Sequence, residues 1–173
     1  IHKGFKWLLS IRQDDGGWAA PLRTIGAKYL DVVSSPPIKP DPSKPFSHLI
    51  TGIVLRAFAA HPDYRKSKEA ISAANLLKIR FFKPDKYVDR RDKNYWTRFS
   101  FPFWFTDLLS ALDSLSLMQF SNQDKEIKKA LEWFINNQKE NGSWELKLLK
   151  DKDKSLNHWI CLAICRIFRR FYT

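Results

Sequence analysis

The chain has 173 residues, of which 44% are hydrophobic and 28% are charged, and it carries a net charge of +12. This length and composition favour one globular domain with a sizeable core, so we take residues 1–173 as a single domain. No apolar run reaches the ~18 residues that a membrane-spanning helix needs. Two cysteines are too few for a disulfide framework, so we expect a reducing compartment, the cytoplasm.

The spacing of apolar residues predicts an all-α protein. Main helices are expected over about 1–12, 46–60, 64–82, 103–117 and 155–171, with another through 127–135 and a short one over 25–33. Five of the nine prolines lie between 36 and 45, so the connection over about 34–45 is predicted to be extended. Ser47 is a plausible N-cap for the helix that follows. The six main helices are expected to pair in order as three helical hairpins.

One sequence pattern occurs twice, as KGFKWLLSIRQDDGGW over residues 3–18 and as KALEWFINNQKENGSW over residues 129–144. In the first copy the apolar stripe of Trp7, Leu8 and Ile11 is predicted to be buried. A glycine then ends the helix, because glycine adopts the positive φ that a sharp turn requires, and the tryptophan two residues later can fold back on the helix end. An internal repeat of this kind predicts a repeat architecture.

This pattern resembles the QW repeat of the squalene cyclase and protein prenyltransferase superfamily. The family pattern runs from a basic residue through an aromatic residue to Gln and Gly-x-Trp, and Gln138, Gly142 and Trp144 match its end. The first copy differs, with Arg12 in the position of Gln138. A weaker third copy begins at residue 74 and has Pro84 where the others have glycine. The resemblance implies an α/α toroid in which motif helices lie outside, and three hairpins would form half of such a ring.

Squalene-type cyclases protonate an alkene with an Asp-x-Asp-Asp cluster, and this sequence contains no such cluster. Asp107 and Asp113 are the better candidates for catalytic carboxylates, since both lie on a predicted inner helix where a buried acid with a raised pKa could act. The alternative is structural, because Asp107 would also stabilise the first turn of that helix.

The residues that could contact a ligand lie in two segments. Phe103, Trp104 and Phe105 could stabilise a hydrocarbon or a carbocation, although such residues are more often plain core. Arg90 and Arg91 belong to a basic segment, 78–98, that could hold a phosphate-bearing ligand or an acidic partner. We do not expect nucleic acid binding, because no nucleic-acid recognition motif accompanies this segment.

Candidate metal ligands lie at the start of the last predicted helix. His158, Cys161 and Cys165 share one helical face, and His48 or Asp107 would have to complete a zinc site from neighbouring inner helices. The Asp-x-Cys element of the zinc prenyltransferases has no counterpart here. We therefore predict no bound metal and no cofactor.

Two functional interpretations follow. The first is a non-catalytic binding module with a concave surface of inner helices, which would take an apolar or phosphate-bearing ligand. The alternative is an isoprenoid-handling enzyme, a relative of the terpenoid cyclases or prenyltransferases, or part of one. A half-ring leaves apolar flanks, so we expect either a homodimer or an N-terminal half in a longer chain.

Overall fold

The computed structural model describes residues 1–33, 36–88, 92–100, 103, 105–148 and 155–173. In this part of the chain the regular structure is helical, which confirms the all-α prediction. The α-helices are α1 (His2–Ser10), α2 (Pro21–Thr24), α3 (Tyr29–Val33), α4 (His48–Ala60), α5 (Lys68–Lys78), α6 (Leu108–Leu117), α7 (Lys125–Asn136) and α8 (Leu156–Tyr172). Among the described residues, the 3-10 helices η1 (Tyr64–Lys66) and η3 (Lys93–Thr97) lie in the connections.

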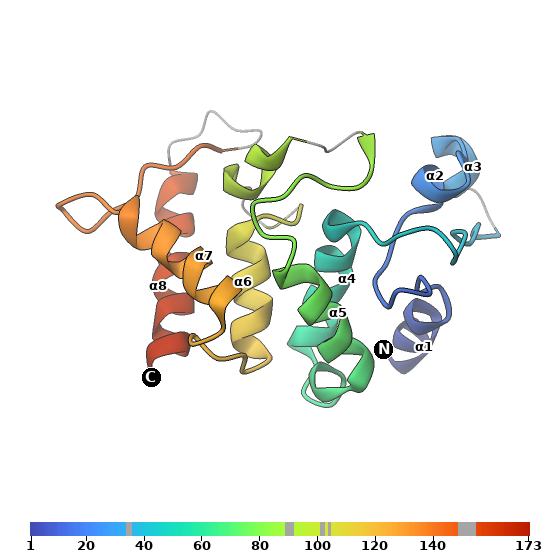
Figure 1. Ribbon diagram of the computed structural model, residues 1–173, viewed down its shortest axis with the longest axis horizontal. Coiled ribbons are helices and arrows are strands. Elements are labelled where there is room, and N and C mark those ends of the chain that lie inside the picture. The colour runs from blue at the N-terminus through green and yellow to red at the C-terminus, as the bar shows by residue number, and fades with distance from the viewer. Residues whose placement is uncertain (34–35, 89–91, 101–102, 104, 149–154) are drawn as a thin grey trace.

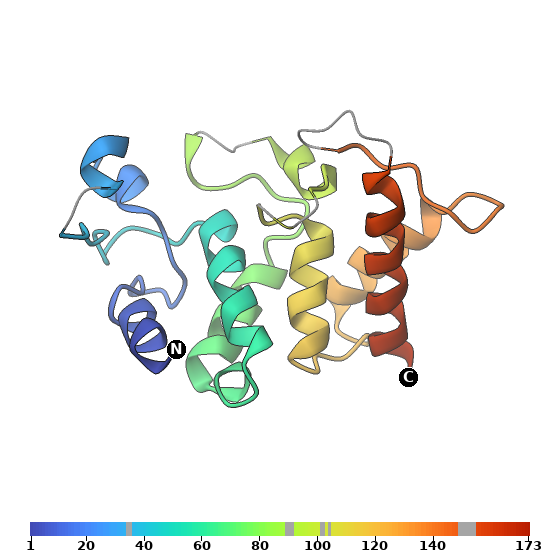
Figure 2. The ribbon, with the colours of Figure 1, turned by 180° about the vertical axis from the view of Figure 1, so that it is seen from behind.

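The helices form two layers of an α/α toroid-type arrangement. Helices α4, α6 and α8 lie side by side as the inner layer, with α6 packed against both of the others (Figure 2). On the other side, α5 packs on α4 and α6, and α7 packs on α6 (Figure 1). Helix α1 joins the outer layer through the turn after its C-terminus, where Gly16 lies against Ser72 and Leu76 of α5.

The core lies between the two layers. Helix α6 is buried along most of its length, because it has neighbours on three sides; four of its five leucines, at 108, 109, 112 and 115, are fully buried. Burial of each such side chain stabilises the fold by about 1.5–3 kcal/mol. Among the described residues, none of the helices combines the length and the apolar character that crossing a membrane requires.

The three inner helices begin at the same edge of the molecule, the upper edge in Figure 1, where the long connections also run. Helix α4 approaches the segment before α6 very closely there. A Cβ atom on Gly52 would lie 2.3 Å from the side chain of Thr106, whose hydroxyl donates to the carbonyl of Leu49 at 2.6 Å. Glycine at 52 therefore lets the two inner helices start close together.

The two copies of the sequence motif have the same hydrogen bonds. The indole of Trp18 donates to the carbonyl of Leu8, and that of Trp144 donates to the carbonyl of Phe134, both at 2.8 Å. Each glycine turn has positive φ, 95° at Gly16 and 80° at Gly142. Each of these carbonyls also accepts the N–H of the residue that follows its helix, Ile11 at 3.3 Å and Asn137 at 3.2 Å, so the indole adds a second hydrogen bond at the helix end.

Arg12 takes over the hydrogen bond of the glutamine in the first copy. Its Nη2 donates to the carbonyl of Gly16 at 2.6 Å, and Gln138 donates to the corresponding carbonyl of Gly142 at 2.8 Å. In the third copy, Arg80 donates in the same way to the carbonyl of Pro84. The weak copy therefore preserves the bond across the turn although it lacks the glycine.

Several helices are shorter than the sequence predicts. The expected helix 64–82 is divided into η1 and α5, because Ser67 caps α5 with its side chain. The expected helix 103–117 begins only at 108, since Asp107 is its N-cap. The predicted burial of Trp7 is wrong: its side chain is 45% exposed, and α1 instead buries Phe5 against Phe58 of α4. Helix α2 was not predicted.

Candidate functional site

Polar side chains gather at the upper edge, where the inner helices begin. One of them is Asp85, whose side chain is inaccessible to solvent. It accepts hydrogen bonds from the hydroxyl of Ser47 at 2.8 Å and from the backbone N–H groups of Leu49 and Tyr87, each at 3.2 Å. A carboxylate at the N-terminus of a helix is favourable because it satisfies free N–H groups and the helix dipole. Asp85 therefore caps α4 from a distant part of the chain.

Arg23 and His48 complete the network around Asp85. The Arg23 guanidinium donates to the hydroxyl of Ser47 at 2.5 Å and lies 4.0 Å from the Asp85 carboxylate. The His48 ring stacks on Trp96 at 4.6 Å between centroids, and its Nδ1 lies 3.5 Å from Asp85. Burial lowers the pKa of His48 to about 4, although the charge of Asp85 opposes this. The His48 ring is thus neutral at neutral pH.

A pocket of about 540 Å³ lies beside this network. Its lining is mainly apolar, with Arg23 and Tyr87 as the polar members and Ala20, Leu22, Ile50 and Val88 as the others. The Tyr87 hydroxyl donates to the carbonyl of Pro45 at 2.5 Å, and the Arg23 guanidinium lies 5.7 Å from the Tyr87 ring. Concave, mostly apolar sites with a few fixed polar groups are typical of small-molecule sites.

The candidate carboxylate Asp107 lies at the start of α6. Its carboxylate accepts from the backbone N–H of Ser110 at 2.7 Å and of Ser100 at 3.4 Å, and its own N–H donates to the Ser110 hydroxyl. This reciprocal arrangement is a capping box. Burial raises the pKa of Asp107 to about 6, whereas the hydrogen bonds from the two serines and the charge of Arg56 lower it.

The second candidate, Asp113, is on the same helix but is not brought together with Asp107 in one site. It pairs with Arg170 of α8 at 2.6 Å, and the same guanidinium donates to Ser116 at 3.1 Å. Between α4 and α6, Arg56 donates to the carbonyl of Phe103. The pKa of Arg56 is lowered by burial, with the charges of Asp107 and Asp113 opposing.

The proposed ligand-contacting residues are placed only in part. Phe103 and Phe105 are half-buried, and Phe103 packs against the core. Trp104, Arg90 and Arg91 lie outside the described residues. Elsewhere in the basic segment, local partners occupy several cations: Lys78 pairs with Asp124, and Arg98 lies 3.6 Å from Asp92.

The residues weighed for a metal site are not close together. His158 is exposed on the first turns of α8, and Cys161 contacts the carbonyl of Trp144 at 3.5 Å. Cys165 is an exposed free thiol, whereas His48 belongs to the Asp85 network. Within the described part of the chain, no three His, Cys, Asp or Glu residues are placed to hold a metal ion.

Comparison with protein families gives a match to the squalene-hopene cyclase C-terminal domain over residues 1–159. The chain belongs to this family. Comparisons with curated proteins and with solved structures gave no significant match. The family match and the helical layers agree on a terpenoid cyclase-like domain.

Within this cyclase-type domain, three residues of the network at α4 were not singled out from the sequence. Nothing in the sequence indicates that Asp85, Arg23 or Tyr87 contacts the start of α4. Ser47 gives a partial indication of this site. A serine N-cap satisfies only one of the free N–H groups at the start of a helix, so the others need a further acceptor. That signal predicts an acceptor but does not say which distant residue provides it.

Proposed function

We propose that this cyclase-type domain is a non-catalytic binding module, and that the 540 Å³ pocket beside α4 takes a small apolar ligand. The single observation that carries the proposal is the chemistry of the pocket wall. Leu22, Ile50 and Val88 provide the apolar surface, and Arg23 and Tyr87 provide polar contacts at one side. None of the lining residues within the described chain is a carboxylate.

The state of the carboxylates supports binding over catalysis. A general acid must present a proton-bearing oxygen to the substrate. Asp85 accepts three hydrogen bonds at α4, Asp107 caps α6, and Asp113 is held by Arg170. Each of these side chains therefore already has a structural role at the edge or between two helices.

The ligand should be apolar with one hydrogen-bond acceptor. The guanidinium of Arg23 provides hydrogen-bond donors at the pocket wall. The Asp85 carboxylate lies 4.0 Å from this guanidinium and offsets its positive charge. A neutral acceptor, such as a hydroxyl or a carbonyl oxygen, is therefore favoured over a strongly charged group. The wider concave surface of α4, α6 and α8 would offer further apolar contact to a longer ligand.

Binding of farnesol, followed by the fluorescence of the chain's tryptophans, would test the proposal. We expect Leu22→Asp or Val88→Asp to weaken binding by about tenfold or more, because a charge replaces apolar contact worth at least ~1.4 kcal/mol. Both side chains are exposed, at 39% and 78%, so the fold should tolerate the changes. Ile135→Asp, on α7 and 48% exposed, is the matched control and should bind normally. Equal binding by all variants would exclude this pocket.

The isoprenoid-handling enzyme is the second candidate, and the raised pKa of Asp107 favours it. A carboxyl with a pKa of about 6 keeps part of its proton near neutral pH, as a general acid must. The test is incubation with squalene and, separately, with geranylgeranyl diphosphate, followed by mass spectrometry of the products. Cyclised product that disappears in Asp107→Asn would establish the enzyme, whereas absence of product from both substrates supports the binding module.

A further inference from the structure

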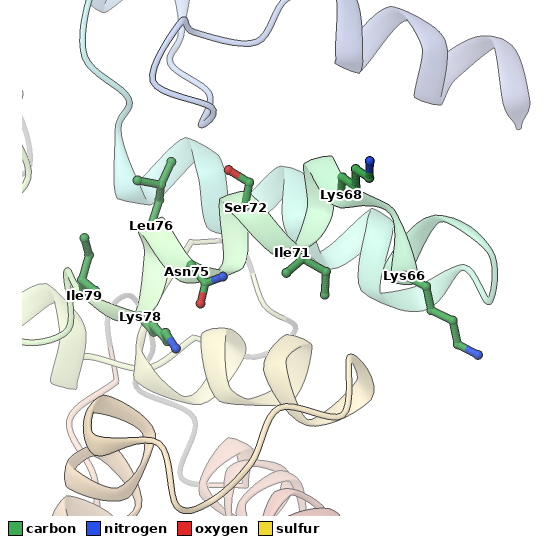
Figure 3. A pocket seen from close by; sticks show the side chains of 8 residues that line it. All are labelled: Lys66, Lys68, Ile71, Ser72, Asn75, Leu76, Lys78 and Ile79. Atoms are coloured by element: carbon green, nitrogen blue, oxygen red, sulfur yellow. The ribbon is translucent and has the colours of Figure 1, made fainter.

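A second hollow, made by different residues, lies on the outward side of α5 (Figure 3). It is a shallow groove of about 710 Å³. The opposite side of α5 is buried through Ala70, Ala73, Ala74 and Leu77, so the helix is fixed in the fold by one face and presents the other. The turn after α1 borders the groove, because Gly16 lies against Leu76.

The groove combines an apolar floor with positive charge. Ile71, Leu76 and Ile79 give the floor, and the side chain of Ile79 is 46% exposed. Lys66 and Lys68 are exposed at the N-terminal end of α5. Among the residues that the structure describes, no ion pair involves either of them, and no carboxylate lines the groove.

Lys78 differs from the other two lysines. Its ammonium pairs with Asp124, the N-cap of α7, and its side chain is only 15% exposed. It therefore fixes α5 to α7 and adds little free charge. The uncompensated charge lies at one end of the groove, near Lys66 and Lys68, and the exposed apolar surface lies at the other end, near Ile79.

We propose that this groove docks an acidic amphipathic helix of a partner protein. Its apolar side chains would cover Ile71, Leu76 and Ile79, and its carboxylates would pair with Lys66 and Lys68, which fixes the direction of the helix along α5. A nucleic acid fits less well, because the groove lining has no aromatic side chain for base stacking and a phosphate backbone gains nothing from the apolar floor.

The test uses a fluorescein-labelled synthetic helix with leucines on one face and glutamates beside them, and it measures fluorescence anisotropy with the full chain. The groove variant is Lys66→Glu/Lys68→Glu. Its control is Lys125→Glu/Lys128→Glu on α7, where both lysines are exposed and the change in net charge is the same. We expect the groove variant to bind about tenfold or more weakly and the control to bind as the native chain does.

Two further measurements separate the groove from general charge attraction. Ile79→Ser should weaken binding several-fold without altering the charge, and a peptide with serines in place of leucines should not bind. Circular dichroism of every variant checks that the helices are retained. Equal weakening by both lysine pairs, or displacement of the peptide by a single-stranded oligonucleotide whose binding depends on Lys66 and Lys68, would overturn the proposal.

Discussion

At the scale of single residues, His48 and Asp107 are buried ionisable groups whose pKa values are shifted so that the neutral form is favoured in each. Burial lowers the pKa of His48 to about 4 and raises that of Asp107 to about 6. Their contributions to the free energy of unfolding change with pH in opposite directions, so the two partly cancel in the native chain. Single variants separate the two contributions.

His48 should make the fold less stable in acid. The unfolded chain, with a histidine pKa near 6.5, binds the proton more readily than the folded chain, so the contribution of His48 is present above pH ~6.5 and is lost as the pH falls toward 4. Between pH 7 and pH 5 the loss is about 2 kcal/mol. His48→Phe can still stack on Trp96 but does not titrate. When the pH falls from 7 to 5, its free energy of unfolding should therefore rise by about 2 kcal/mol relative to that of the native chain. Urea unfolding at both pH values measures it, and a difference that does not change with pH would contradict the assignment.

Asp107 should show the reverse dependence. Its folded pKa is raised, so its contribution is present below the unfolded value near 3.8 and is lost as the pH rises through about 6. Asparagine is also a good N-cap. We expect Asp107→Asn to gain stability relative to the native chain between pH 5 and pH 7, by about 1 kcal/mol, and Asp107→Ala to lose about 1 kcal/mol more than Asn. Thermal unfolding of both variants at the two pH values is the measurement.

At the scale of elements, the repeated motif is a helix end closed by an indole. Trp18 and Trp144 are almost completely buried, and each donates to a carbonyl of its own helix at the same distance. Loss of such a hydrogen bond costs about 0.5–1.5 kcal/mol, and the smaller phenyl ring also leaves a gap in the core. Trp18→Phe and Trp144→Phe should therefore destabilise the chain by similar amounts, about 1–2 kcal/mol each. Trp7→Phe, at a half-exposed site, should change stability by less than about 0.5 kcal/mol in the same denaturant titration.

The sequence could predict this element because the helix, the glycine turn and the indole are within 16 consecutive residues. The sequence shows Arg12 in the position of the glutamine, but it could not predict that the guanidinium would donate to the same carbonyl. The site at α4 was missed for a related reason. Ser47 was recognised as a cap, but its partners Asp85 and Arg23 come from distant parts of the chain, and only the packing of the layers brings them together.

At the scale of the whole molecule, α8 is the last helix of the inner layer and has one open flank. Trp159 and Leu162 lie one turn apart on it and are 53% and 52% exposed. Exposed apolar surface of this kind favours association, and we propose a second copy of the chain as the partner. Light scattering should then give a dimer, and Leu162→Glu should give a monomer while Ile135→Glu remains dimeric. A native chain that is monomeric at high concentration would contradict the proposal.

The capping of α4 by Asp85 also has a consequence for the order of synthesis. Ser47 satisfies the N–H of Ile50 as soon as α4 exists, but the N–H of Leu49 has no acceptor until Asp85, 36 residues later, has been added. At 5–20 residues per second, α4 waits on the order of seconds for its cap. The first hairpin is thus completed by a residue that follows the outer helix of the second, and a released chain truncated before residue 85 should hold α4 less firmly than one truncated after residue 88.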